Sequence, residues 1–156
     1  MSTINGRACV VNGKPVDKVF SNGRQVYGRN LVTGTSNELI TMTISGWGNS
    51  RTYKPNGTYG AGKYYASAYI ENTTPVDMTI WIRVDGSGYN IKSDIIPAGQ
   101  NGVVSFTFDI LEGDSLYGIW VGFSKSQTES YTYNYKEMMV TRTPSPWTPA
   151  PEDILN

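Results

Sequence analysis

The residues with the clearest chemical potential are aromatic side chains that stand among hydroxyl, amide and guanidinium groups. In the strand predicted over 78–84, Trp81 and Arg83 alternate with an apolar face, and Trp120 does the same in the strand predicted over 116–123. Flat rings beside hydrogen-bonding groups suit sugars, whose C–H patches stack on the rings while their hydroxyls bond to polar neighbours. If the predicted strands share one sheet, its outer face presents five candidate ligand-binding residues: Tyr65, Tyr69, Trp81, Arg83 and Trp120.

A long loop over residues 46–62 supplies further candidates. It combines Trp, Arg, Asn and Tyr in a glycine-rich segment, a composition common in binding loops, and loops of this length are usually functional or mobile. Its candidate residues are Trp47, Asn49, Arg51, Tyr53 and Tyr59. In the alternative interpretation, the aromatic rings of the loop fold back as a lid on the core. Trp81 and Trp120 have the same alternative, because a two-layer fold can bury both faces of a strand.

The catalytic potential of the chain is limited. Without histidine there is no Ser-His-Asp or Cys-His catalysis and no HExxH zinc site. A glycosidase requires two suitably spaced carboxylates, but the acidic residues lie mostly in predicted turns and no pair stands out. Oxygen ligands in such turns could hold a structural calcium ion, although no dense acidic motif specifies one. We therefore expect neither catalysis nor a cofactor.

Charge and hydropathy exclude several kinds of partner. Lys+Arg 13 balance Asp+Glu 13 in 156 residues, and a neutral chain without a basic run is unlike proteins that bind nucleic acid or anionic membranes. No segment approaches the roughly 20 apolar residues of a membrane span, and the polar start has no signal-peptide core. Cys9 cannot form an internal disulfide, so the redox compartment stays open.

The turn and strand pattern predicts an all-β protein. Asn-Gly, the dipeptide that favours tight hairpin turns, occurs five times, and short runs rich in Val, Ile, Thr, Tyr and Trp separate the turns. Regular short strands of this kind indicate a β-sandwich of jelly-roll type. Tyr131, Tyr133 and Tyr135 fall on one face of the last predicted strand, a stripe that indicates packing or a subunit contact more than a binding site. The predicted strands cover 39–45, 64–71, 78–84, 103–110, 116–123 and 131–141.

The two ends of the chain differ from this pattern. Residues 11–16 and 21–26 repeat an Asn-Gly turn between short apolar stretches, which predicts a small β-meander within residues 1–28. Such a meander is too short to bury its own core, so it must pair with the main domain, another copy or a larger assembly. The main domain then covers 29–156, and its proline-rich end over 144–153 is expected to run extended.

Three segments carry a resemblance to a known family. The closing strand reads Tyr135-Lys136-Glu137-Met138-Met139-Val140 and leads to Pro146-Trp147-Thr148-Pro149-Ala150-Pro151-Glu152-Asp153. These segments resemble the last strand and tail of carbohydrate-binding-module-like domains in bacteriophage tail proteins, although Lys-Glu-Met-Met replaces the more usual Lys-Leu-Glu-Lys-Gly. The segments 29–36 and 64–70 resemble the opening and an early strand of the same domains. The resemblance spans about residues 29–153.

The resemblance implies a jelly-roll module that binds host cell-wall saccharide, without catalysis, from a virion tail or baseplate of a phage of Gram-positive bacteria. The N-terminal 1–28 segment would attach the module to other tail or baseplate proteins, and homo-oligomerisation is left open. The protein would be made in the host cytoplasm. In the alternative interpretation, the chain is a structural spacer or oligomerisation module without a ligand, because interface cores also favour Tyr and Trp.

Overall fold

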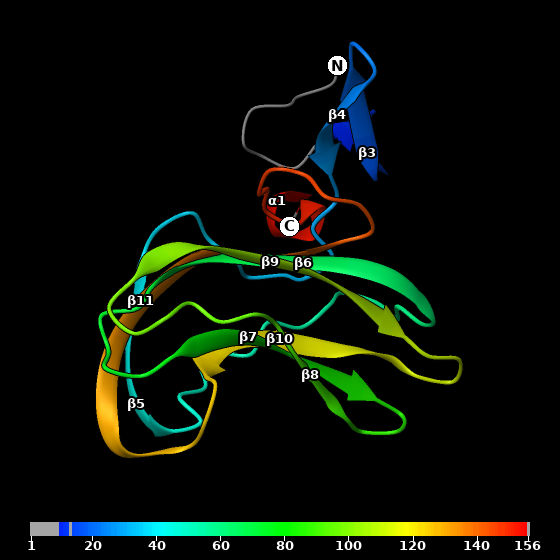
Figure 1. The fold of residues 1–156 in the computed structure, drawn as a ribbon. Coiled ribbons are helices and arrows are strands. Elements are labelled where there is room, and N and C mark those ends of the chain that lie inside the picture. The colour runs from blue at the N-terminus through cyan, green and yellow to red at the C-terminus, as the bar shows by residue number, and fades with distance from the viewer. Residues whose placement is uncertain (1–9, 13, 156) are drawn as a thin grey trace.

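Two antiparallel sheets pack face to face in this protein (Figure 1). A computed structural model describes residues 10–12 and 14–155. The larger sheet has the order β5-β11-β6-β9, and the smaller sheet has the order β10-β7-β8. The expected β-sandwich is therefore confirmed. Its strands are β5 (Ile40–Gly46), β6 (Gly62–Glu71), β7 (Met78–Asp85), β8 (Asn90–Lys92), β9 (Asn101–Ile110), β10 (Ser115–Phe123) and β11 (Gln127–Thr141).

Alternation along the strands builds the core between the two sheets. In β6 the even-numbered residues from Tyr64 to Ile70 are buried, while Tyr65, Ser67 and Tyr69 point outward. In β7 the even-numbered residues from Met78 to Val84 are fully buried. The core forms because the apolar faces of both sheets are removed from water together. The faces predicted for these two strands are confirmed with one exception: Thr79, expected on the outer face beside Trp81, is fully buried and hydrogen-bonded to Ser93.

The start of β10 departs from the predicted alternation. In the pattern over 116–123, Tyr117 falls on the apolar face opposite Trp120 and is therefore expected in the core. Tyr117 is instead 37% exposed, and Leu116 is buried in its place. The pairing of β10 with β7 shifts between Leu116 and Gly118, which is a β-bulge that turns one extra residue outward. The prediction for Tyr117 was wrong because a bulge leaves no mark in a period-two pattern. The three-residue strand β8 was also not predicted.

The expectation that the candidate aromatic residues share one sheet is also wrong. Strands β6 and β9 belong to the larger sheet, whereas β7 and β10 belong to the smaller one. Tyr65 and Tyr69 therefore face outward on one side of the sandwich, and Trp81, Arg83 and Trp120 face outward on the other side.

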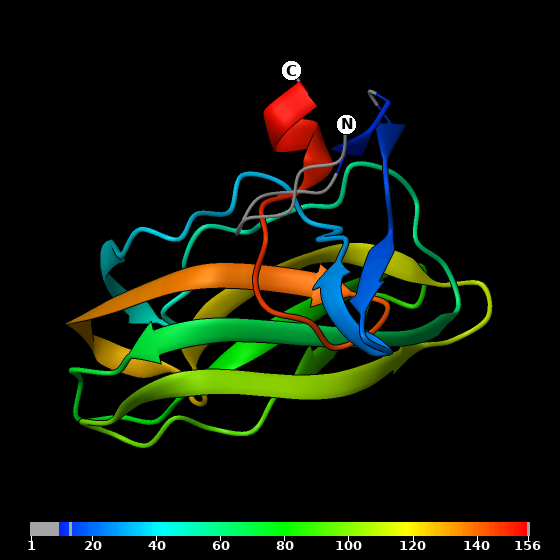
Figure 2. The same cartoon turned by 90° about the horizontal axis from the view of Figure 1, so that it is seen from above.

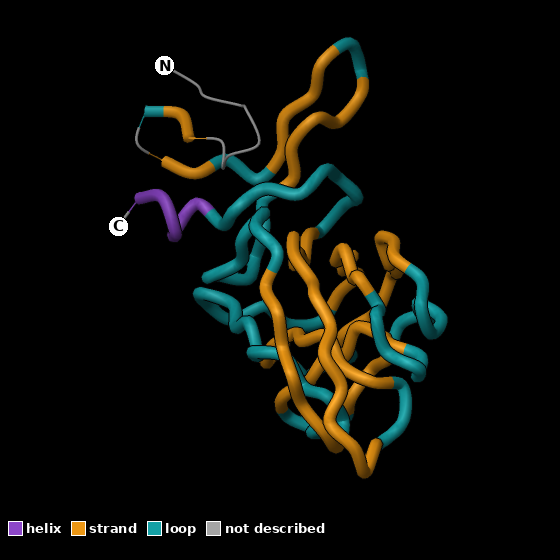
Figure 3. The backbone as a smooth tube through the Cα atoms, turned by 90° about the vertical axis from the view of Figure 1, so that its left-hand side faces the viewer, coloured by secondary structure: helices purple, strands orange, loops and turns teal. Residues whose placement is uncertain are grey.

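The N-terminal segment forms two separate hairpins. Strands β1 (Val10–Val11) and β2 (Lys14–Pro15) pair with each other, as do β3 (Lys18–Ser21) and β4 (Arg24–Gly28). Asn22 and Gly23 join β3 to β4 with φ values of 51° and 73°, as a tight hairpin turn requires. Neither hairpin joins a sheet of the sandwich among the described residues, and the β3–β4 hairpin projects away from it (Figure 3). The Asn5-Gly6 turn and Cys9 lie outside the described residues.

The C-terminal tail crosses the larger sheet and ends in a short helix, α1 (Pro151–Leu155) (Figure 2). Residues 144–150 have no regular structure, but the expectation of an extended chain was wrong from residue 151 onward. Proline suits the first position of a helix, and the acidic residues of the first turn complement its dipole. Asp153 accepts hydrogen bonds from the backbone N–H of Gly34, and Glu152 pairs with Arg29.

Asn30 is a buried polar residue that joins three segments. Its side-chain nitrogen donates hydrogen bonds to the carbonyl oxygens of Met138 at 3.1 Å and Thr148 at 2.9 Å. Its side-chain oxygen accepts hydrogen bonds from the N–H groups of Val32 and Val140, each at 3.2 Å. Because the residue is fully buried, these partners replace the water that its amide loses. Asn30 thereby ties the start of the main domain to β11 and to the tail.

We expect Asn30→Asp to lower the free energy of unfolding by about 3 kcal/mol, since a carboxylate would face two carbonyl oxygens in a buried site. Urea unfolding at neutral pH measures the difference. The matched control is Asn37→Asp, because Asn37 is exposed, and it should stay within about 0.5 kcal/mol of the original protein. Equal effects of the two substitutions would contradict this role for Asn30.

Three tyrosines pack together in the core, and the hydroxyl of each is hydrogen-bonded. The hydroxyls of Tyr53 and Tyr135 lie 2.7 Å apart, and the hydroxyl of Tyr133 donates to the carbonyl oxygen of Gly48. All three side chains are at most 2% exposed. Burial raises the pKa of Tyr53 and of Tyr133 above the ordinary tyrosine value, and for Tyr53 the hydrogen bond with Tyr135 raises the pKa further. The stripe over 131–135 therefore serves packing at Tyr133 and Tyr135.

These raised pKa values predict a loss of stability in alkali. The folded state keeps Tyr53 and Tyr133 protonated, whereas the unfolded chain ionises them from about pH 10. Their contribution is complete below about pH 10, and the free energy of unfolding falls as the pH rises above it. Urea unfolding across this range should show a shallower fall for Tyr53→Phe, which also loses about 1 kcal/mol at neutral pH. Tyr117→Phe, at an exposed tyrosine, is the control, and an equal change in both variants would refute the prediction.

Candidate functional site

An open groove of about 640 Å³ lies on the outer face of the smaller sheet. Strands β7, β8 and β10 form its floor, and residues that follow β5 form one wall. We call it the tryptophan groove. Its lining residues are Trp47, Asn49, Thr52, Trp81, Arg83, Asp85, Asn90, Tyr117 and Trp120.

Strand register arranges this floor as two neighbouring rows. Trp81 of β7 pairs with Trp120 of β10 and with Lys92 of β8, which makes an aromatic row across the sheet. Two residues further along β7, Arg83 pairs with Gly118 and Asn90 and makes a polar row. A flat apolar surface thus lies directly beside hydrogen-bonding groups.

Three tryptophans form a graded aromatic surface. The rings of Trp81 and Trp120 are stacked at 15°, with centroids 6.4 Å apart, and Trp47 meets Trp81 edge-on at 5.7 Å. Trp120 is 9% exposed, whereas Trp47 is 51% exposed. The indole N–H of Trp81 donates to the carbonyl oxygen of Phe123 at 3.0 Å, which fixes the ring orientation. Trp120 is the buried base of the surface, and Trp47 is its accessible end.

The segment 47–53 is fixed to the free edge of β10. Backbone hydrogen bonds join Phe123 N–H to the Trp47 carbonyl, Ser50 N–H to the Val121 carbonyl, and Tyr53 to Ile119 in both directions, all at 2.8–3.0 Å. This half of the long loop therefore behaves as an additional short strand and is not a free lid. Trp47 and Asn49 are exposed beside the groove, while Gly48 and Ser50 are buried.

Gly122 provides the space that this aromatic packing needs. A Cβ atom at this position would lie 2.6 Å from the Trp47 carbonyl oxygen, 3.3 Å from Cδ1 of Trp81 and 3.5 Å from Cδ1 of Trp120. The first distance is too short for any side chain, so the tryptophans can approach one another only across a glycine. The sequence alone allows these rings to be either core or surface. Trp120 is largely buried and also lines the groove, so it belongs to both.

Charged groups lie at the rim of the groove. Arg83, Asp85 and Asn90 offer donors and acceptors, and the Lys92 ammonium lies 5.9 Å from the centroid of the Trp81 ring. Asp85 is the one carboxylate among the described residues that line the groove. Glycosidases act through a pair of carboxylates on either side of the scissile bond. The arrangement is therefore suited to holding a polar ligand against aromatic rings.

The structure brings together five of the ten candidate residues: Trp47, Asn49, Trp81, Arg83 and Trp120 line the tryptophan groove. Tyr53 does not fit the expectation, because its ring is 2% exposed and its hydroxyl is bonded to Tyr135. Arg51 lies beside the Tyr53 ring, 5.5 Å from its centroid, and is not among the residues of the groove.

The other candidates lie elsewhere on the sandwich. Tyr59 packs against the core near Arg142, whose guanidinium carbon is 5.9 Å from its ring centroid. Tyr65 and Tyr69 lie on the larger sheet, on the opposite face from the groove. Sequence reasoning also missed Thr52, Asn90 and Tyr117. Thr52 reaches the groove because segment 47–53 pairs with β10, Asn90 because β8 joins the sheet, and Tyr117 because of the bulge in β10.

The acidic side chains of the described residues are dispersed over the surface and turns. No three side chains of Cys, Asp or Glu in this part of the chain gather in a way that could hold a metal ion. Asp114 instead supports a turn, since its carboxylate accepts hydrogen bonds from the Ser87 N–H at 2.8 Å and hydroxyl at 3.0 Å. Within residues 10–12 and 14–155, no helix has the length and apolar character needed to cross a membrane.

Comparison with known proteins finds similarity only among solved structures. No protein-family model and no curated protein sequence match the chain. The C-terminal domain of EclA, a sugar-binding protein, is 14% identical with a TM-score of 0.45, over 69% of this chain and 80% of that one. A variant of the family 29 carbohydrate-binding module CBM29-2 is 13% identical with a TM-score of 0.44, over 98% of this chain and 96% of that one.

A third solved structure comes from a virion. The tripod from the baseplate of bacteriophage Tuc2009 is 18% identical with a TM-score of 0.45, over 78% of this chain and 58% of that one. The similar structures thus include carbohydrate-binding modules and a phage baseplate component. At these identities no ligand and no residue role is carried across to this chain.

The graded burial of the tryptophans predicts different effects of their removal. We expect Trp120→Ala to lower the free energy of unfolding by about 3 kcal/mol, because it removes a largely buried ring and leaves a cavity beside Trp81. Trp47→Ala should cost at most about 1 kcal/mol, the size of one exposed aromatic contact. Urea unfolding measures both, and Leu111→Ala is the control at an exposed apolar residue. A larger loss for Trp47 than for Trp120 would contradict the arrangement described here.

Proposed function

We propose that this chain is a non-catalytic module of a phage tail or baseplate that binds bacterial cell-wall saccharide in the tryptophan groove. The observation that carries the proposal is the aromatic row with Trp81 and Trp120, which Trp47 extends edge-on, beside the polar row of Arg83 and Asn90. Sugar rings present C–H patches on one face and hydroxyls at their edges, so they match both rows at once.

Each part of the groove has its own task in this proposal. Trp47 and Trp81 stack on the sugar ring, and Trp120 supports Trp81 from the neighbouring strand. Arg83 donates hydrogen bonds from a planar fork, while Asp85 and Asn90 supply acceptors, which sets the orientation of the ligand. A groove with a single carboxylate in its described lining has no second group to act as nucleophile or base, which supports binding without hydrolysis.

The virion setting rests on the sequence resemblance of residues 29–153. Two N-terminal hairpins that do not join the sandwich sheets in the described part of the chain suit an attachment element for other tail or baseplate proteins. One open groove binds weakly, but many copies on one particle raise the effective concentration and give firm attachment.

The test is binding of a multivalent fluorescent fusion of the full chain to Gram-positive cells and to their extracted wall polysaccharide. We expect labelling, and we expect Trp81→Ala to weaken binding about 30-fold, since loss of a central tryptophan typically costs about 2 kcal/mol or more. Trp47→Ala should weaken binding while the protein keeps nearly full stability. Leu111→Ala, outside the groove, should bind as the original protein does.

Three outcomes would contradict the proposal. No labelling across a broad panel of hosts would favour the structural spacer, and a stable oligomer whose tryptophans resist acrylamide quenching would point the same way. Release of reducing sugar that is lost in Asp85→Asn would instead show an enzyme.

A further inference from the structure

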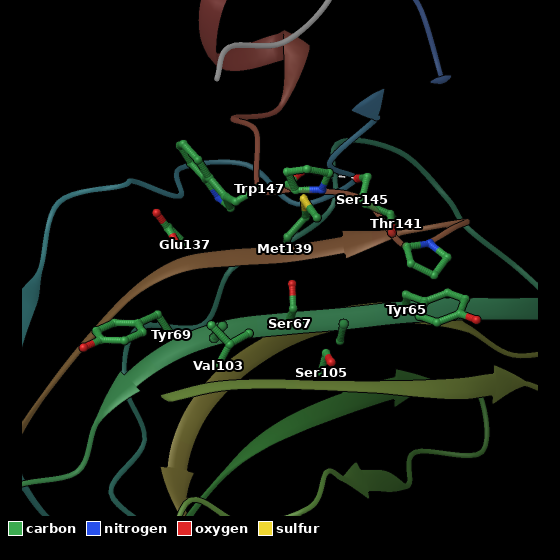
Figure 4. A pocket seen from close by; sticks show the side chains of 14 residues that line it. Tyr65, Ser67, Tyr69, Val103, Ser105, Glu137, Met139, Thr141, Ser145 and Trp147 are labelled. Carbon is green, nitrogen blue, oxygen red and sulfur yellow. Dashed lines mark hydrogen bonds between the residues drawn. The ribbon is translucent and has the colours of Figure 1, made fainter. Parts of the chain in front are cut away.

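A second groove lies on the opposite face of the sandwich, over the larger sheet (Figure 4). It has a volume of about 580 Å³ and runs over β6 and its two neighbours. Residues 144–147 of the C-terminal tail form one wall, and the other side opens towards β9, the edge strand of the sheet. We call it the tail groove. The proposed function does not use it.

The sequence of three adjacent strands shapes the floor of the tail groove. Tyr65 and Tyr69 point outward from β6, four residues apart, which places them about 13 Å apart along the strand. Between them Ser67 pairs with Ser105 of β9 and with Met139 of β11. The two small serines leave a trough between the tyrosine rings, and Figure 4 shows Ser67 between Tyr65 and Tyr69.

The floor offers hydrogen-bonding groups that the protein leaves unused. Within the described part of the chain, the hydroxyls of Ser67 and Ser105 have no hydrogen-bond partner. Ser105 is exposed and Ser67 is half-buried, so both are accessible from the groove. Each hydroxyl can donate one hydrogen bond and accept up to two. The floor is therefore matched to a ligand that carries many hydroxyls of its own.

The tail wall adds a third aromatic ring, which is held in place. The indole N–H of Trp147 donates to the Met138 carbonyl oxygen at 3.1 Å, and the next residue, Thr148, is bonded to Asn30. Trp147 is half-buried, so part of its ring remains accessible. The wall is consequently a fixed part of the domain.

A β-bulge in β11 brings charged groups to the same groove. Pairing between β11 and β6 shifts between Lys136 and Met139, and Glu137 has a left-handed φ of 59°, a conformation that costs a non-glycine residue about 1–2 kcal/mol. The Glu137 carboxylate lines the groove and lies 3.9 Å from the Lys136 ammonium, which is itself 5.3 Å from the Tyr69 ring centroid. The two charges offset each other, so this rim favours neither anions nor cations.

We propose that the tail groove is a second saccharide site, independent of the tryptophan groove. Tyr65, Tyr69 and Trp147 provide stacking faces, Ser67 and Ser105 bond to ligand hydroxyls, and Glu137 accepts a hydrogen bond at the rim. The near-neutral surface with unused hydroxyls selects an uncharged, hydroxyl-rich chain. A protein partner would cover a much larger area, about 800 Å² on each side, than this narrow trough offers.

The four tryptophans allow the two sites to be observed separately. Trp47, Trp81 and Trp120 report on the tryptophan groove, and Trp147 reports on the tail groove. The experiment is a titration of the ¹⁵N-labelled full chain with soluble fragments of Gram-positive wall polysaccharide, followed by the four indole N–H signals in NMR spectra. We expect the Trp147 signal to shift and saturate, and to do so equally in Trp81→Ala, where the tryptophan groove is impaired.

A blocking variant makes the test specific. Ser105→Trp fills the trough from an exposed position on the edge strand. It should raise the apparent Kd obtained from the Trp147 signal by at least about tenfold and leave the shifts of the tryptophan groove unchanged. Thr128→Trp, at an exposed position of β11 outside both grooves, is the matched control and should bind as the original chain does.

The outcomes separate this proposal from the proposed function. Shifts of Trp47, Trp81 and Trp120 with an unmoved Trp147 signal would overturn the second site and leave the first. A Trp147 shift that disappears in Trp81→Ala would also overturn it, because the sites would then not be independent. A Trp147 shift alone would support the second site and count against the tryptophan groove, and no shift at all would count against both.

Discussion

The side-chain amide of Asn30 is the interaction on which the arrangement of the domain most depends. A buried amide must have partners, and Asn30 finds them in the segment that follows it, in β11 and in the tail. These contacts hold the tail across the larger sheet, and with it the position of Trp147. They also lie beside the bulge at Glu137. One buried polar residue behind the tail groove thus decides whether the outer face of the larger sheet is a plain surface or a walled groove.

On the other face, the same task is performed by backbone hydrogen bonds. The segment 47–53 adds to the edge of β10, and Gly122 lets the three tryptophans approach one another there. Side-chain hydrogen bonds of Asn30 hold the wall of one groove, and backbone hydrogen bonds hold the wall of the other. Both grooves are lined by similar groups, namely aromatic rings, small residues and polar side chains. The two sheets themselves contain no ion pair among the described residues that crosses the core: Lys136–Glu137 lies at the rim of the tail groove, and Arg29–Glu152 joins the tail to the start of the main domain.

The sequence was sufficient for the sandwich strands other than β8 and for most of the core, because alternation in β6, β7 and β9 follows directly from burial of one face. It could not predict which strands share a sheet, since strand order leaves no periodic signal, and Tyr65 and Tyr69 were therefore grouped with Trp81. The positions of Tyr53 and Tyr117 depend on the backbone pairing of segment 47–53 and on a bulge, which are tertiary effects. The short helix after residue 150 could have been expected from Pro151, Glu152 and Asp153 at its first turn.

The strand-like segment 47–53 covers a sheet edge that a neighbouring copy of the protein could otherwise use for pairing. An unpaired sheet edge is a template on which another chain can add a strand, and this hazard grows when many copies are held close together. Here the edge of β10 beside the tryptophan groove is already occupied by the chain itself. Copies packed densely on one particle would therefore not fuse through this edge, and each groove would keep its own opening to the surroundings.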